Sequence, residues 1–82
     1  MHEMSIANSV MDAVRSEVTR RPGARASKVG LRLGEWAGVD AESLRFCFEV
    51  LVKDTEVEPL ALEIEFRPQS CELDIAYLEL EE

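Results

Sequence analysis

The sequence contains one histidine, His2, and two cysteines, Cys47 and Cys71, and this scarcity limits the chemistry that it can support. The two cysteines do not form a C-x-x-C pair, and a structural zinc site usually requires four Cys or His ligands. No nucleophile, base and acid set remains if His2 binds a metal, and no phosphate-binding loop is present. We therefore expect no enzymatic activity and no structural zinc, with both thiols reduced.

Long apolar segments and basic clusters are also missing. The apolar runs are only a few residues long, which is too short to span a membrane. Residues 1–6 contain an acid and no basic cluster, so they do not resemble a secretory signal, and we expect that no leader precedes Met1. The expected location is the cytoplasm.

Lysine and arginine are scarce in the second half of the chain, which accounts for much of the formal net charge of −8. Nucleic-acid binding depends on basic patches, so this balance argues against it. A basic partner or a cation would suit the acids, although most of them are better explained as a solvated surface. The acids are Glu56, Glu58, Glu63, Glu65, Glu72, Asp74, Glu79, Glu81 and Glu82.

Hydrophobic periodicity predicts two helices in a chain of 82 residues, a length that is typical of one domain. The first is expected from Ser5, as its N-cap, to about Arg20, before Pro22-Gly23. The second is expected to start after the N-cap Asp40 and to run to about Lys53. Its buried stripe consists of Leu44, Phe48 and Leu51, and Phe46 and Val50 lie off that stripe. This helix is therefore either packed on two sides or offers a docking surface.

Alternating apolar residues predict three strands, from Lys28 toward Trp36, over residues 60–67 and from Leu73 onward. Gly34 and Gly38 indicate a bent, exposed turn over residues 35–37 rather than more strand. A shift of phase in the last one indicates a bulge between Ala76 and Leu78. Trp36, between two glycines, is expected in the core, with an exposed contact as the alternative. The element order is α-β-α-β-β, which predicts an α+β fold: a small three-stranded sheet with two helices packed against it.

Met1-His2-Glu3 places a free amine, backbone amides and an imidazole close together, and such nitrogen-rich sites favour square-planar Ni(II) or Cu(II). The amine and the His2 amide close one chelate ring, and the His2 imidazole closes another. The Glu3 amide is a further donor, and its carboxylate is an axial ligand or a hydrogen-bond partner. Asp40 is either a nearby carboxylate of the site or a plain N-cap. The ordinary alternative for such a terminus is that it is mobile and has no function.

Protons compete with a metal for these nitrogens. In short peptides the α-amino group titrates at about 7.7–8.0 and imidazole at about 6.5. Metal binding must release those protons, so we expect nickel affinity to fall between mildly alkaline and mildly acid pH.

Five segments of the chain carry a family resemblance: Met1-His2-Glu3-Met4-Ser5-Ile6, Val29-Gly30-Leu31-Arg32-Leu33-Gly34-Glu35, Glu42-Ser43-Leu44-Arg45-Phe46-Cys47-Phe48-Glu49, Leu62-Glu63-Ile64-Glu65 and Glu72-Leu73-Asp74-Ile75. The resemblance is to the HypA/HybF family of nickel-insertion proteins of hydrogenase maturation. It implies a nickel metallochaperone in which His2 binds Ni(II) with support from Glu3. The implied partners are a maturation GTPase and a nickel-enzyme precursor of the hydrogenase or urease system. A metal-free docking module for that GTPase is the alternative.

The chain departs from this family at one place. Members carry a zinc subdomain with two C-x-x-C pairs between the last two strands, whereas here Arg67-Pro68-Gln69-Ser70 leads almost directly into Cys71. We expect residues 1–82 to form a single nickel-binding domain that lacks the zinc subdomain at about residues 67–72. Both a natural short form and a deletion are consistent with this join. A short bridge also favours strand exchange, so we expect a monomer or a weak, domain-swapped dimer.

Overall fold

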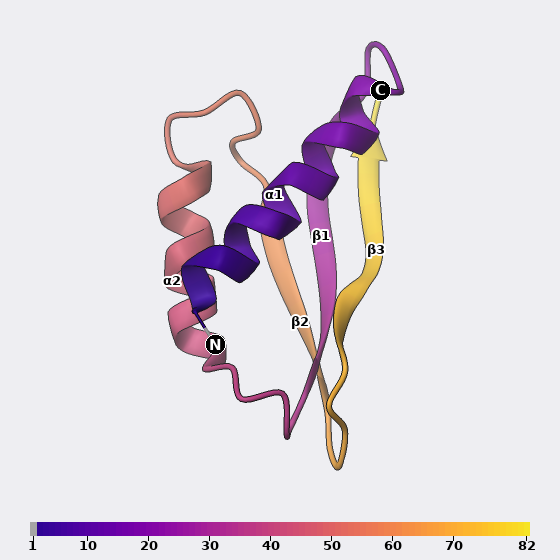
Figure 1. Cartoon of the computed structure of the whole chain (residues 1–82). Coiled ribbons are helices and arrows are strands. Elements are labelled where there is room, and N and C mark those ends of the chain that lie inside the picture. Colours follow the sequence, from indigo (N-terminus) through magenta and orange to yellow (C-terminus); the bar gives the residue numbers. More distant parts are fainter. Residues whose placement is uncertain (1) are drawn as a thin grey trace.

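The computed structural model describes residues 2–82 and contains two helices and three strands. Their order along the chain confirms the predicted α+β arrangement (Figure 1). The elements are α1 (Glu3–Thr19), β1 (Arg25–Gly34), α2 (Ala41–Val52), β2 (Ala61–Arg67) and β3 (Leu73–Glu81).

The sheet has the strand order β2-β1-β3, so β1 is central. It pairs in parallel with β2, and α2 forms the crossover that a parallel connection requires. It pairs antiparallel with β3. Figure 1 shows α1 crossing one face of the sheet diagonally and α2 lying beside β2, which gives a fold of two layers.

The core lies between the helices and this face of the sheet. The fully buried side chains come from the predicted stripes of both helices and from alternate positions of β1, because those positions face the same interior. The largest of them are Phe48, Met11, Leu31, Leu44, Val14 and Val29. No helix in the described part of the chain is long and apolar enough to cross a membrane.

Helix α1 begins at Glu3, so the prediction that Ser5 caps it is wrong. His2 occupies the N-cap position in an extended conformation. Its carbonyl oxygen accepts hydrogen bonds from the amides of Ser5 (3.1 Å) and Ile6 (3.3 Å). The helix extends further than the local signals indicate because Glu3 gains a tertiary contact with the start of α2.

The predicted bulge in β3 is confirmed. Gly30 of β1 faces Tyr77, and the next residue, Leu31, faces Ile75, so Ala76 is the extra residue. By contrast, β1 starts at Arg25, earlier than the predicted Lys28. It ends at Gly34, before the turn that the sequence predicts over residues 35–37.

Two aromatic residues are far more exposed than their sequence context predicts. Trp36 is 61% exposed and Phe66 is 62% exposed, so the expectation of a core tryptophan is wrong. Figure 1 shows the cause: the ends of the strands near the β2–β3 turn extend beyond both helices. Burial at these positions would require a covering layer that the helices do not provide there.

The opposite face of the sheet is held by a polar contact across all three strands. The Tyr77 ring of β3 lies over Gly30 of β1, and its hydroxyl donates a hydrogen bond to the Glu63 carboxylate of β2. This hydrogen bond, with desolvation and the Glu63 charge, raises the pKa of Tyr77 to about 12. The same bond, together with the charge of Lys28, lowers the pKa of Glu63.

Candidate metal site at the N-terminus

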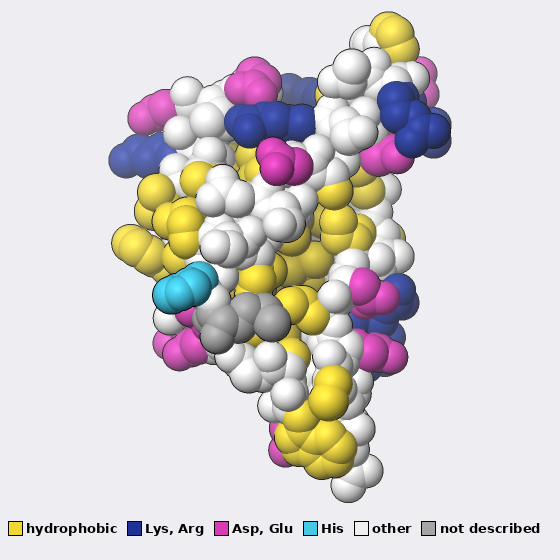
Figure 2. Space-filling view, in the orientation of Figure 1, with side chains coloured by type: hydrophobic (Ala, Val, Ile, Leu, Met, Phe, Trp, Pro, Cys, Tyr) yellow, Lys and Arg dark blue, Asp and Glu magenta, His cyan; other side chains and the backbone are white. Residues whose placement is uncertain are grey.

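His2 is exposed at the start of α1. Figure 2 shows this histidine, in cyan, next to hydrophobic side chains that lie over α2. The neighbouring Met1, which carries the proposed amine ligand, lies outside the described residues. The side chain of His2 is therefore accessible from solvent.

The Glu3 carboxylate is held by the other helix. Its Oε2 atom accepts a hydrogen bond from the backbone amide of Asp40 at 3.2 Å. Glu3 is half-buried, and its negative charge lies in the first turn of α1, where the helix dipole favours it. This contact fixes the N-terminus of α1 against the N-terminus of α2. In the structure, the Glu3 carboxylate therefore acts as a hydrogen-bond acceptor.

Asp40 is the N-cap of α2, as the sequence predicts. Its Oδ1 atom accepts hydrogen bonds from the amides of Glu42 (2.9 Å) and Ser43 (3.2 Å). The side chain therefore satisfies two amides that have no partner within the helix, while its own backbone amide holds Glu3. The structure brings Asp40 close to the start of α1, but its carboxylate is committed to the cap.

Backbone nitrogen is the main donor type available at this end of the molecule. The first amides of an α-helix have no intrahelical acceptor, and Glu3 is the first residue of α1. Within residues 2–82, no three His, Cys, Asp or Glu side chains come together in a way that could hold a metal ion. The start of α1 presents the His2 imidazole, the first main-chain amides of the helix and the Glu3 carboxylate.

The comparison with known protein families connects this chain to nickel incorporation. The family model described as "Hydrogenase/urease nickel incorporation, metallochaperone, hypA" matches residues 1–74, and this match includes His2, Glu3 and Asp40. The chain belongs to the HypA family. The predicted resemblance is confirmed, and the family description agrees with the nickel function that it implies.

Several curated HypA proteins are similar to this chain, and each is named hydrogenase maturation factor HypA. The protein of Chlorobium limicola is 46% identical over 65 residues, which cover 79% of this chain and 56% of that protein. The protein of Methanopyrus kandleri is 45% identical over 65 residues and is covered to 46% of its length. The protein of Azoarcus sp. is 44% identical over 71 residues, which cover 85% of this chain and 61% of that HypA.

The chain spans about half the length of the curated HypA relatives that it matches. Its two cysteines lie in different elements, Cys47 in α2 and Cys71 in the turn before β3, and both are free thiols. Two thiols do not provide the four ligands of a structural zinc site, so no zinc-dependent role is assigned to them.

Substitutions at Asp40 should test its role as the N-cap of α2. We expect Asp40→Ala to lower the free energy of unfolding by about 0.5–2 kcal/mol because two amides of α2 lose their acceptor. Asp40→Asn keeps an acceptor oxygen and should stay close to the wild-type protein. Thermal unfolding followed by circular dichroism measures both, and equal losses for the two variants would contradict the capping role.

Proposed function

We propose that this chain is the nickel-binding domain of a HypA-type metallochaperone, which takes up Ni(II) at its N-terminus and passes it to a nickel-enzyme precursor. The observation that carries the proposal is the family match, which begins at residue 1 and includes His2 and Glu3. The metal is cargo rather than a catalytic cofactor, so the domain is not an enzyme. A maturation GTPase of the hydrogenase or urease system is the proposed partner in delivery.

In the proposed site, the amine of Met1, the amide of His2 and the imidazole of His2 bind one side of a square-planar ion. The Glu3 amide is available as a further donor because it is the first amide of α1. The Glu3 carboxylate, which accepts a hydrogen bond from the Asp40 amide, serves as a positioning group. Asp40 acts through this contact and through its cap rather than as a metal ligand.

The location at a helix N-terminus favours this kind of chelate over an ordinary cation site. The positive end of the helix dipole opposes a bare cation. Amides that lose a proton on binding Ni(II) bring negative charge to the same place, which offsets the dipole. A ligand set based on amide nitrogen is therefore more compatible with the start of α1 than one based on neutral ligands alone.

The contribution of His2 to nickel affinity is tested by Ni(II) titration of the wild-type protein and of His2→Ala. We expect the substitution to weaken nickel binding by more than about a hundredfold, because loss of a group that only supports a ligand already costs about 10–100-fold. Calorimetry and the absorption of square-planar nickel provide the readout. Asp40→Asn is the control and should retain nickel affinity. Equal uptake by the wild-type protein and His2→Ala would overturn the proposed site.

A docking module without metal remains the second candidate, and it is favoured by the outer face of α2. Phe46 is 66% exposed and Val50 is 50% exposed, one helical turn apart. The sequence analysis gave a docking surface on this helix as one of two alternatives. Hydrophobic side chains over α2 lie beside His2 (Figure 2). Retained binding of the maturation GTPase by His2→Ala, combined with no nickel uptake by the wild-type protein, would favour this candidate.

A further inference from the structure

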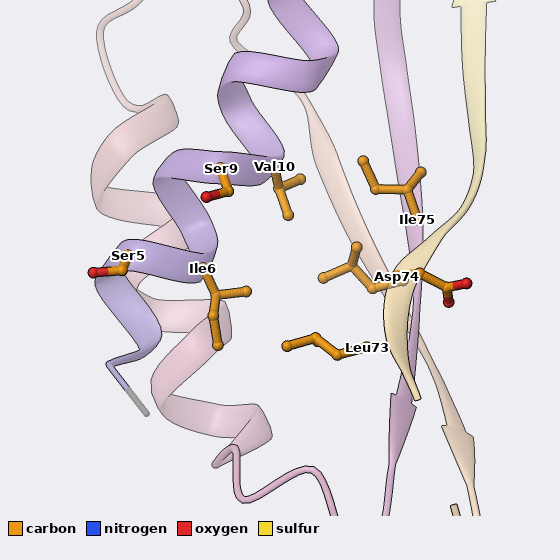
Figure 3. Close-up of a pocket in the computed structure, with 8 residues that line it drawn as sticks. Ser5, Ile6, Ser9, Val10, Leu73, Asp74 and Ile75 are labelled. Carbon is orange, nitrogen blue, oxygen red and sulfur yellow. The ribbon is translucent and has the colours of Figure 1, made fainter. Parts of the chain in front are cut away.

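An apolar groove lies between the first half of α1 and the start of β3. It encloses about 410 Å³, and its apolar side chains are Ile6, Val10, Leu31, Leu73 and Ile75. In Figure 3, Ile6 and Val10 of α1 face Leu73 and Ile75 of β3 across the open space. The groove exists because α1 crosses the sheet obliquely and leaves this part of the helix-covered face open (Figure 1).

The outer edge of β3 borders this groove and offers free backbone groups. β3 is an edge strand, and the Glu72 carbonyl, just before it, points inward and accepts from the Gly34 amide at 2.7 Å. Because backbone direction alternates along a strand, the amides and carbonyls of Leu73 and Ile75 point away from β1. The other edge is partly covered, since Arg45 of α2 donates to the Leu62 carbonyl of β2 at 3.2 Å.

The charge of the β3 edge indicates what kind of segment can bind there. Residues 71–82 contain five acids and no lysine or arginine. Arg32 pairs with Asp74 at 2.9 Å, Arg25 lies 3.7 Å from Glu81 and Arg67 lies 3.8 Å from Glu72. The arginines that meet these acids therefore come from β1 and from the end of β2. A second copy would bring another net charge of −8 against the same acidic edge. A basic segment would meet complementary charge.

We propose that the outer edge of β3 binds an extended segment of a partner protein in which apolar residues alternate with lysine or arginine. The segment adds a strand next to Leu73 and Ile75 by main-chain hydrogen bonds. Its apolar side chains enter the groove under α1, because alternate residues of an added strand face that side. Its basic side chains lie on the opposite face, near Asp74 and Glu79. This surface is separate from His2 and does not depend on nickel.

The probe is an acetylated peptide of alternating lysine and valine, added to the full chain. Hydrogen exchange followed by NMR should show that the peptide slows exchange of the Leu73 and Ile75 amides at least about tenfold relative to the free protein, because an added strand gives these amides acceptors. A peptide with alternating glutamate and valine should not bind. A lysine–valine peptide with N-methyl groups on the amides that face β3 should also fail, because it cannot pair with a strand edge.

Ile75→Lys should weaken binding of the lysine–valine peptide at least tenfold by placing a charge in the groove. Ala61→Lys, which adds the same charge at an exposed position of β2 away from the groove, is the control and should bind like the wild-type protein. If Ile75→Lys does not fold, Ser9→Trp narrows the groove from the exposed rim of α1 and should have the same effect.

Two results would overturn the proposal. One is equal binding of the lysine–valine peptide to the wild-type protein, Ile75→Lys and Ser9→Trp, which would indicate attraction to acidic charge alone. The other is a concentration-dependent dimer in sedimentation experiments that Ile75→Lys abolishes, which would show that a second copy covers this edge.

Discussion

Placing the extension Gly-Ser-Gly-Ser ahead of Met1 should reduce nickel affinity by more than about a hundredfold, or about 2.7 kcal/mol of binding free energy. The extension moves the α-amino group away from His2 and leaves an ordinary peptide bond at Met1. The proposed chelate then loses its first nitrogen, while the imidazole and the fold remain. Calorimetric titration with Ni(II) measures the loss, and circular dichroism verifies that the helices are retained.

The length of the extension matters. A single added residue is unsuitable because it places His2 third from the new amine, and an amine, two amides and an imidazole can complete a different four-nitrogen plane. Extension by Gly-Ser-Gly-Ser avoids this arrangement. Chemical acetylation of the amine is a matched control, since it removes the donor without lengthening the chain. Nickel affinity within a few-fold of wild type for both forms would refute a ligand role for the amine.

The pH dependence of nickel binding offers an independent check on the same chelate. Wild-type affinity should fall as the pH decreases, because protons displace the metal from the amine and the imidazole. The extended form should show a weaker dependence around the titration of an α-amino group, about 7.7–8.0.

The elements of the fold were predictable from periodicity, because apolar residues repeat with the spacing of the structure that buries them. Val10 and Val14 on α1 and Leu44 and Phe48 on α2 are buried as expected. Phe66 continues the alternation of β2 but is exposed. Alternation identifies which face a residue occupies, whereas burial also requires that another element reaches that part of the face.

The sequence proposes residues for the candidate site but does not reveal their contacts. His2, Glu3 and Asp40 were identified from residue chemistry, capping preference and family resemblance. The hydrogen bond from the Asp40 amide to Glu3 joins residues 37 positions apart, so no local pattern could reveal it. That contact also explains why α1 starts at Glu3 instead of after a Ser5 cap. Tertiary contacts decided the details at this end of the molecule.

Gly34 lies where the turn between β2 and β3 crosses the end of β1. Arg67 at the end of β2 and Leu73 at the start of β3 flank β1 on opposite sides, so residues 68–72 must pass over it. The turn lies close to the backbone of β1 and the residues that follow it. The Gly34 amide donates a hydrogen bond to the Glu72 carbonyl at 2.7 Å, and the Trp36 amide donates one to the Ser70 carbonyl at 2.8 Å. This geometry explains how a short segment joins strands that are not neighbours.

Replacing Gly34 by alanine should be the most destabilising single substitution in this region. A Cβ atom there would lie 2.2 Å from the Ser70 carbonyl oxygen and 2.7 Å from the Glu72 nitrogen. Both are backbone atoms, so relief requires moving the turn and weakening its hydrogen bonds. We expect a loss of about 3 kcal/mol, at the upper end of the usual cost of overpacking. For a domain of this size the melting temperature would fall by about 12–24 °C.

Two other glycines provide matched controls for this effect, which differential scanning calorimetry can measure. Gly23→Ala introduces only the cost of a positive φ, because no atom lies within 4 Å of the added carbon. Gly30→Ala places its Cβ atom against the Tyr77 ring, a side chain that can rotate away, so Tyr77→Ala should suppress the loss. No second substitution of a side chain should rescue Gly34→Ala. A melting temperature for Gly34→Ala equal to that of Gly23→Ala would contradict a tight crossing at this turn.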